Sequence, residues 1–297
     1  IPDGLVTGVQ TCALPIYPVI APAPWTWRDR ECGSPCAVVN AGGVLVYHRG
    51  HMGGRDRIGL AWAPADGFQP ELLRDHPANP LLDTGPPGAW DAAAVTCPSV
   101  VAWHGAWMMF FEGRDGAGRP AIGAATSVDG VVWVKYPRNP VVQGAAPAAA
   151  IADDGSLRLW TRDGDTLTVA ESRDGITWRN AARVPTPHPL RVSARTPHAG
   201  GGTLLLAAPD AGRPGLELLS CDAAGTLAPS PGLVLPVGIR GAWDDGGVWP
   251  GALVRAGGRT WLLYEGWGAG YRDGSPPASA LPSPPAIGAA ELVTPAH

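Results

Sequence analysis

Hydrophobic and polar positions along the chain recur as pairs of short apolar runs separated by a glycine-containing turn. Three segments show this most clearly: GSPCAVVNAGGVLVYHRG, TCPSVVAWHGAWMMFFEG and WPGALVRAGGRTWLLYEG. In each of them, two runs of strand length flank a short turn. The pattern predicts a β-hairpin whose first strand is mostly buried.

Fixed spacings show that the three hairpins are copies of one repeat. A tryptophan precedes each hairpin, and a glycine closes the second apolar run 23 residues after that tryptophan. Self-similarity at a constant interval is the sequence signature of a repeat architecture. The three pairs are Trp27 and Gly50, Trp90 and Gly113, and Trp243 and Gly266.

A third strand and a tight turn follow the hairpins. The segments AIGAATSVDGVVW and TVAESRDGITW share Ser-x-Asp-Gly-x-x-Trp, where glycine tolerates positive φ and the tryptophan lies on an outer strand. With the outer strand, each unit therefore has four strands. We therefore expect an all-β fold, a five-bladed β-propeller with four-stranded antiparallel blades around a central axis. The units lie near residues 17–78, 79–140, 141–188, 189–236 and 237–297.

Composition agrees with many short strands. The 297 residues include 41 Gly and 33 Pro with 16% charged residues, which is rich in turns and unfavourable to long helices. The length favours one large domain. The net charge of −4 offers no basic patch, and no apolar run reaches the roughly 18 residues of a membrane span. We expect neither a nucleic acid nor a membrane as partner.

The N-terminal segment 1–16 differs in origin from the rest in our interpretation. Val6 to Ile16 reads VTGVQTCALPI, one reading frame of a widely used sequencing adapter, so we expect it to come from library preparation. Residues 17–297 are then expected to form a single propeller domain. The fifth unit lacks an obvious fourth strand, and in a closed ring the N-terminal segment often supplies it. Localisation is not predicted, because the native start is missing.

Cysteines and histidines give no sign of a metal site. The histidines that could approach the axis have no metal-ligand spacing on one element. Past residue 16 the cysteines lack metal-finger spacing, so we expect buried thiols without a disulfide framework. We expect no metal and no other cofactor. The residues concerned are His48, His51, His198, Cys32, Cys36, Cys97 and Cys221.

The segment 79–142 resembles a blade of the propellers of glycoside hydrolase families 32 and 43. It reads NPLLDTGPPGAWDAAAVTCPSVVAWHGAWMMFFEGRDGAGRPAIGAATSVDGVVWVKYPRNPVV. The resemblance covers nearly all residues after 16 and is strongest in the first, second and fifth units. It implies a glycosidase whose acidic residues stand at the mouth of a central funnel, one of them beside the proline that opens an innermost strand.

The sequence departs from the family pattern at these strand-opening prolines, because the residues beside them are not acidic. This departure favours a second hypothesis, a non-catalytic carbohydrate-binding propeller that has lost the family's acids. The residues beside the prolines are Ser34 and Cys36, Cys97 and Ser99, Thr196 and His198, and Trp249 and Gly251.

Other acidic residues converge at the same end of the predicted blades. In an antiparallel hairpin, the start of the first strand and the end of the second lie together. Glycoside cleavage needs two carboxyl groups about 5 to 10 Å apart, and the second and fifth units could supply them. The candidate catalytic residues are Asp91, Glu112, Asp244 and Glu265. Alternatively, the two aspartates bind loop amides and the recurring glutamates are structural.

Two tryptophans are the best candidates for a sugar-binding platform. Trp249 and Trp267 have no counterpart in the other units, whereas most other tryptophans follow the repeat and are expected in the core. Arg49, Arg114 and Asp245 belong to the same rim and complete the predicted substrate-binding set. The sequence thus predicts a glycosidase-like hydrolase acting on a carbohydrate at the axial funnel, with the binding propeller as the alternative.

Overall fold

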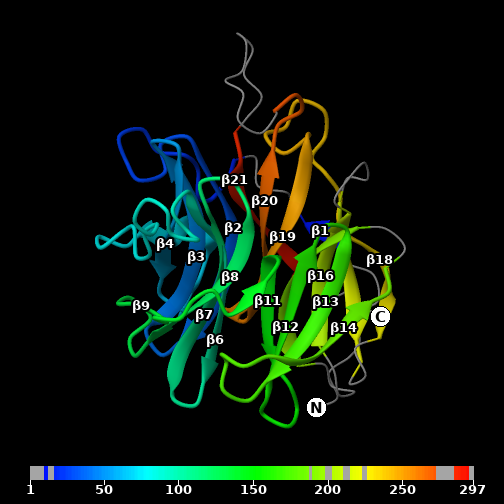
Figure 1. Ribbon diagram of the computed structural model, residues 1–297. Coiled ribbons are helices and arrows are strands. Elements are labelled where there is room, and N and C mark those ends of the chain that lie inside the picture. The colour runs from blue at the N-terminus through cyan, green and yellow to red at the C-terminus, as the bar shows by residue number, and fades with distance from the viewer. Residues whose placement is uncertain are drawn as a thin grey trace.

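The computed structural model confirms the predicted all-β class. The residues that it describes form strands and turns, with a single 3₁₀ turn, η1 (Pro70–Leu72). None of these residues belongs to a helix long and apolar enough to cross a membrane. Figure 1 shows that consecutive strands lie next to one another in sheets. The described residues are 10–12, 17–186, 189–197, 203–209, 215–222, 226–271 and 284–293.

Five antiparallel units account for almost all strands of the described residues. The first unit contains β2 (Glu31–Asn40), β3 (Gly43–Met52), β4 (Arg55–Ala63) and β5 (Arg74–Asp75). The second contains β6 (Ala94–Trp103), β7 (Ala106–Arg114), β8 (Pro120–Ser127) and β9 (Val134–Lys135), with β10 (Val142–Gln143) also paired to β8.

The remaining units follow the same order. The third contains β11 (Ala145–Ile151), β12 (Leu157–Asp163), β13 (Thr166–Ser172) and β14 (Arg179–Val184). The fourth contains β15 (Leu190–Pro197), β16 (Thr203–Pro209), β17 (Leu216–Cys221) and β18 (Leu227–Leu235). The fifth contains β19 (Gly247–Ala256), β20 (Arg259–Trp267) and β21 (Ala286–Val293), with β1 (Gln10–Cys12) as its outer strand.

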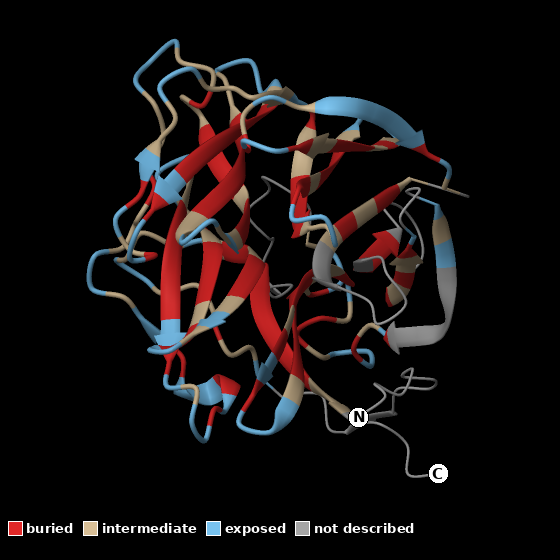
Figure 2. Cartoon of the chain, turned by 90° about the horizontal axis from the view of Figure 1, so that it is seen from below, coloured by how far each residue is buried: buried red, intermediate tan, exposed pale blue. Residues whose placement is uncertain are grey.

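The first strands of the units contact one another in a cycle. Strand β2 contacts β6, β6 contacts β11, β11 contacts β15, β15 contacts β19, and β19 contacts β2. The first two units also share one sheet through a single parallel pair, Asp56 with Ala94, whereas the other units are separate sheets. Figure 2 shows that buried residues concentrate in the strands and exposed residues in the turns.

Contact between the marker tryptophans and the strand glycines explains the interval of 23 residues. A Cβ atom on Gly50 would lie 2.3 Å from the ring of Trp27, and one on Gly113 would lie 2.3 Å from the ring of Trp90. The fifth unit repeats the arrangement. The indole can lie on the strand only where no side chain projects, so this glycine and this tryptophan depend on each other.

Each of these indoles also packs against a ring two residues before the glycine. The ring centroids are 5.0 Å apart for His48, 5.7 Å for Phe111 and 5.8 Å for Tyr264. Burial lowers the pKa of His48 to about 4, so this imidazole is neutral at pH 7 and packs as an aromatic ring.

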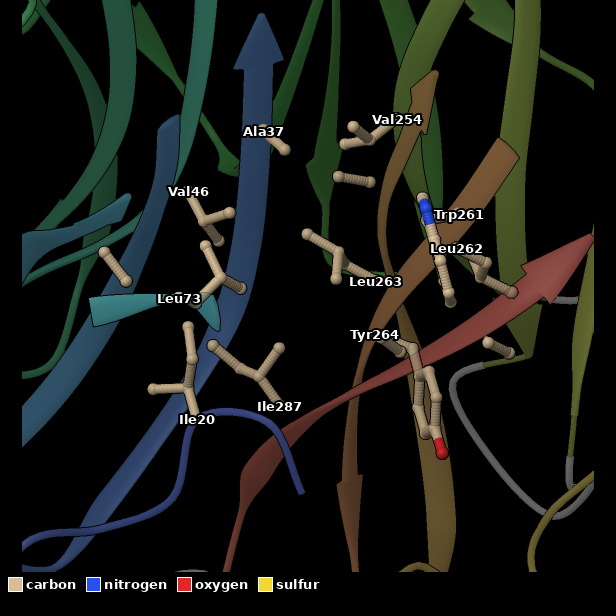
Figure 3. Packing of buried hydrophobic residues seen from close by; sticks show 14 of the residues in the cluster. Ile20, Ala37, Val46, Leu73, Val254, Trp261, Leu262, Leu263, Tyr264 and Ile287 are labelled. Atoms are coloured by element: carbon tan, nitrogen blue, oxygen red, sulfur yellow. The ribbon is translucent and has the colours of Figure 1, made fainter. Parts of the chain in front are cut away.

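The largest core cluster joins the two ends of the chain. It packs Val46 of the first unit against Leu263 and Ile287 of the fifth, as Figure 3 shows. Ile20 pairs with Ile287 through backbone hydrogen bonds of 3.2 and 2.8 Å. This apolar contact area stabilises the junction between the first and last units.

Residues of the N-terminal segment supply the outer strand of the fifth unit, the strand for which the sequence showed no obvious candidate within that unit. Strand β1 pairs with β21 in antiparallel fashion, from Gln10 opposite Val293 to Cys12 opposite Glu291. These are residues that we assign to the adapter sequence, so a segment outside the repeat covers the edge of β21.

Candidate functional site

One pocket of the described residues lies where the five first strands begin. Its lining combines small residues and prolines with one carboxylate, one guanidinium, one indole and one thiol. The lining residues are Ser34 and Pro35 from β2, Cys97, Pro98 and Ser99 from β6, Ala146, Pro147 and Ala148 from β11, Arg191, Val192 and Ser193 from β15, Trp249 and Pro250 from β19, and Glu265 from β20.

Three of the first strands begin with a bulge in the left-handed conformation. Ser34, Cys97 and Ala146 have φ values of 50°, 49° and 50°, and each lies at a register shift just before a proline. This conformation costs roughly 1 to 2 kcal/mol for a residue other than glycine. The amides of Ser34 and Ala146 bind carboxylates of a preceding unit, which offsets part of that cost.

Glu265 is the carboxylate of this pocket, and its side chain is 2% exposed. Its Oε2 accepts hydrogen bonds from the amide of Ser34 at 2.7 Å and from the Ser34 hydroxyl at 3.3 Å. Its Oε1 accepts one from Arg49 at 3.3 Å. A Cβ atom on Gly33 would lie 2.3 Å from the carboxyl carbon, so glycine is required beside it. The carboxylate is held rigidly between the fifth and first units.

Glu112 makes the equivalent bridge between the second and third units. Its Oε2 accepts a hydrogen bond from the amide of Ala146 at 2.8 Å, and its Oε1 accepts one from Arg114 at 2.7 Å. Glu112 is buried but does not belong to the pocket lining. Both recurring glutamates therefore join neighbouring units, and Glu265 faces the pocket in addition.

Arg49 occupies the corresponding position in the first unit and holds three carboxylates. Its Nη1 donates to Glu31 at 2.9 Å and lies 3.5 Å from Asp56, while Nη2 reaches Glu265. A hydrogen bond of 2.8 Å joins Nδ1 of His51 to the carboxylate of Asp56, and it raises the pKa of His51. Arg49 thus fixes the pocket carboxylate through a buried charged network.

Asp91 lies away from the pocket lining, in an ion pair with the outer strand of its own unit. Its Oδ2 is 2.5 Å from the ammonium group of Lys135 on β9. The carboxylate packs beneath the preceding loop, because a Cβ atom on Gly85 would lie 2.2 Å from its Oδ1. Asp91 is therefore paired with a lysine that is far along the chain but lies on the outer strand of the same unit.

Asp244 and Asp245 support the loops of the fifth unit and do not line the pocket. Asp244 accepts a hydrogen bond from the Tyr264 hydroxyl at 2.9 Å, and burial raises the pKa of Asp244. Asp245 accepts hydrogen bonds from the amides of Gly241 at 2.7 Å and Ala269 at 2.6 Å, so it joins two loops.

Aromatic and cationic groups also meet in the pocket, next to Glu265, because Trp249 is its cross-strand partner. The guanidinium of Arg191 lies 3.8 Å from the ring centroid of Trp249, a cation–π contact. Trp267 packs edge-on against Trp249 with ring centroids 4.7 Å apart. Of the two predicted platform residues, Trp249 lines the pocket and Trp267 supports it from behind.

Arg191 is a pocket residue that the sequence pattern did not bring out, because we took Pro197 as the proline that opens the first strand of the fourth unit. That assignment is wrong: the first strand, β15, begins at Leu190 and ends at Pro197. Val192 takes the place that proline has in the other first strands. The alternation of buried Leu190 and Val192 around Arg191 was the available signal. His198 lies outside the described residues.

The other polar candidates lie near the pocket in different ways. Arg114 has a side chain that is 43% exposed and pairs with Glu112. Burial raises the pKa of the Cys97 thiol to about 11, so it is protonated at neutral pH. Cys32, Cys36 and Cys221 are free and buried. Within the described part of the chain, no three histidine, cysteine, aspartate or glutamate side chains are grouped as a metal site.

A second, more polar hollow lies at the other end of the strands of the third unit. Glu171 and Arg179 belong to its lining, as do Asp154 and Arg173, which lie 3.6 Å apart. Glu171 pairs with Arg158 at 3.4 Å, and its side chain is 42% exposed. The hollow is built from turns and contains none of the predicted site residues.

Known protein structures share the fold over nearly the full length. A glycosyl hydrolase from Bacteroides ovatus has a TM-score of 0.72 and 14% identity, covering 98% of this chain and 95% of that one. A family 43 β-xylosidase/α-arabinofuranosidase from a compost microbial metagenome has a TM-score of 0.66 and 13% identity, with 96% of both chains covered.

A third similar structure is described with the family 130 mannoside phosphorylases and with glycoside hydrolases that target β-1,2 mannosidic linkages in Candida mannan. It has a TM-score of 0.67 and 15% identity, covering 98% of this chain and 95% of that one. No protein-family model matches the sequence, and neither does any curated protein. At these identities the likeness concerns the fold, and in fold the chain resembles the glycoside hydrolases of families 43 and 130.

Proposed function

We propose that residues 17–297 form one five-bladed β-propeller in which each antiparallel unit is a blade. The cycle of contacts among the first strands supports this, because a closed ring places each first strand beside two others. The backbone pairing of Ile20 with Ile287 supports closure between the first and last blades. The pocket at the start of the first strands is then the axial funnel.

We infer that the protein is a glycosidase-like hydrolase that binds a carbohydrate in this axial pocket. The observation that carries the proposal is the buried carboxylate of Glu265, which lines the pocket together with Trp249, its cross-strand partner on β19. A fixed carboxylate and an aromatic face are elements of sugar-binding sites, and cleavage needs a second carboxyl group in addition. The shared fold with glycoside hydrolases adds an argument by analogy.

The roles that we propose follow from the contacts. Glu265 acts directly on the sugar, because Arg49 and the amide of Ser34 hold its carboxyl group in a fixed position at the pocket. Trp249 and Arg191 bind the sugar ring and its polar substituents. Glu112 occupies the equivalent position of the second unit and binds the amide of the pocket residue Ala146, so it is the first candidate for the second acid, ahead of Asp91 and Asp244.

A specific observation supports a second candidate, a propeller that binds a glycan without cleaving it. Ser34, Cys97 and Ala146 occupy the bulged positions at the pocket, and none of them carries a carboxyl group. Glu265 is the single carboxylate among the lining residues of the described chain. Hydrolysis with two acids therefore depends on a carboxyl group just outside the lining.

The test is hydrolysis of a panel of aryl furanosides and pyranosides by the wild-type chain and its variants. Glu265→Gln should abolish turnover while keeping an acceptor for the amide of Ser34, and Glu112→Gln tests the second acid. Glu171→Gln is the matched control, since Glu171 also pairs with an arginine but lies at the other hollow. Turnover that survives Glu265→Gln would contradict the proposal. Sugar binding without turnover would favour the second candidate.

A further inference from the structure

The loops before β2, β6 and β19 contain the same four-residue turn. In each turn the amide of the fourth residue donates to the carbonyl of the first, over 3.3, 3.0 and 2.8 Å. The third residue has a φ of 64°, 87° and 89°, respectively. A hydrogen-bonded turn with positive φ at this position has the form of a type II turn. The turns span 23–26, 86–89 and 239–242.

The first of these turns carries a tryptophan where the other two carry glycine. Gly88 and Gly241 occupy the left-handed third position, which glycine adopts without steric cost. Trp25 occupies it in the first unit, although Cβ disfavours this conformation. The residue is 97% exposed, so folding gains almost no burial of its indole. A strained and exposed aromatic residue suggests a role outside the fold's own stability.

Contacts place this turn at the pocket end of the first unit. Two residues after Trp25, Trp27 packs on Gly50 of β3. The residue before Gly50 is Arg49, which holds the pocket carboxylate of Glu265. Trp25 lies nine positions before Ser34 of the pocket lining, so the two lie within about 30 Å of each other. Trp25 is thus at the pocket end of the first unit and outside the pocket lining.

We propose that Trp25 is a stacking platform for one sugar unit of an extended glycan whose terminal unit lies in the axial pocket. The inference rests on the proposed carbohydrate function and adds that the ligand is an oligosaccharide or polysaccharide. The flat indole offers an apolar surface to the C–H face of a sugar ring, and the turn presents it with little freedom to move. Trp25 does not belong to the pocket lining, so it would contact a unit of the glycan outside the pocket.

The test compares wild type with Trp25→Gly, which restores the residue of the two equivalent turns. The probes are arabinan, arabinoxylan, β-mannan and levan in affinity gel electrophoresis, and their constituent monosaccharides in calorimetry. We expect about tenfold weaker retention by the preferred polymer and unchanged monosaccharide affinity. The midpoint of thermal unfolding should stay constant or rise by about 2 °C, because the strain is relieved.

The matched control is Trp62→Ala, which removes another exposed tryptophan from the same unit. Trp62 is 38% exposed and lies near the far end of β4. Its removal should leave polymer retention unchanged. Equal retention of wild type and Trp25→Gly would overturn this inference alone, as would equal weakening by both variants. A wild-type chain that binds none of the polymers would overturn the carbohydrate function as well.

Discussion

The first and second units carry the same scaffold with reversed charges. In the second unit, Asp91 follows the marker tryptophan and pairs with Lys135 of the outer strand at 2.5 Å. In the first unit, Arg28 follows the marker tryptophan and pairs with Asp75 of the outer strand at 2.7 Å. The two ion pairs occupy equivalent positions, and only the positive and negative charges are exchanged.

A second reversal within the same two units explains how the pocket is held. The second unit has Glu112 just before its marker glycine, and this carboxylate reaches the amide of Ala146. The first unit has Arg49 there, and its guanidinium reaches Glu265 of the fifth unit. The packing of tryptophan on glycine therefore fixes positions, while charges vary as long as each has a partner. The change to arginine supplies the cation that fixes the pocket carboxylate.

The sharpest way to break this comparison is to give the first unit the residue of the second. Arg49→Glu places a fourth carboxylate among Glu31, Asp56 and Glu265, in buried surroundings. We expect a loss of about 4 kcal/mol in the free energy of unfolding by urea.

The control for that variant is Arg114→Glu. Arg114 also pairs with a glutamate, but its side chain is 43% exposed, so about 1 kcal/mol or less should be lost. Equal losses for the two arginines would contradict a special role of Arg49.

The packing of the marker tryptophan on its glycine, which both units share, is tested by Gly113→Ala. The new Cβ would lie 2.3 Å from the ring of Trp90, so we expect a loss of about 2 to 3 kcal/mol in the free energy of unfolding. Gly116→Ala is the matched control, because no atom lies within 4 Å of its Cβ, and its effect should stay within about 0.5 kcal/mol. Urea unfolding at pH 7 measures both losses. Similar losses for the two variants would show that the indole of Trp90 moves aside for the new Cβ without cost.

Replacing the imidazole under Trp27 by the ring of the second unit should change the pH dependence. Burial lowers the pKa of His48 to about 4, so as pH falls below about 6.5 the unfolded chain takes up a proton that the folded chain does not. This lowers stability as the pH decreases. His48→Phe should remove about 2 kcal/mol of the loss between pH 6.5 and 5. If the free energy of unfolding by urea falls between pH 6.5 and 5 as much in His48→Phe as in the wild type, protonation of His48 is not the cause of the loss.

The smallest expected effect comes from exchanging the outer ion pair. Arg28→Asp and Asp75→Lys alone should each cost about 1 kcal/mol, since the side chain of Asp75 is 35% exposed and partly screened. The double variant recreates the pair of the second unit and should return to within about 0.5 kcal/mol of wild type. A double-mutant cycle in urea measures this, and additive losses would mean that the charges do not interact.

The repeat in the sequence predicted much of the fold, because its marker residues are the residues that contact one another in each unit. The interval between Trp27 and Gly50 reflects an indole lying on a strand, so the amino-acid sequence alone reveals it. The opening of the first strand of the fourth unit was misassigned to Pro197, because Val192 replaces the usual proline there and Pro197 ends the strand. A repeat can be followed only while its marker residues persist.

The site was predictable in part, for the same reason. Glu265 was a candidate because it closes the second strand of its hairpin, and Trp249 was one because it has no counterpart in the other units; both line the pocket. The partner of Asp91 was not readable, since Lys135 lies 44 positions along the chain and its pairing depends on the register of an outer strand. Arg191 was missed through the misplaced strand.

The most direct test of the central claim is a crystal structure of the chain soaked with the oligosaccharide that it binds most tightly. We predict a sugar ring in the axial pocket, in contact with the carboxylate of Glu265 and the indole of Trp249. A sugar bound instead in the hollow beside Glu171 and Arg179, with the axial pocket empty, would contradict the account.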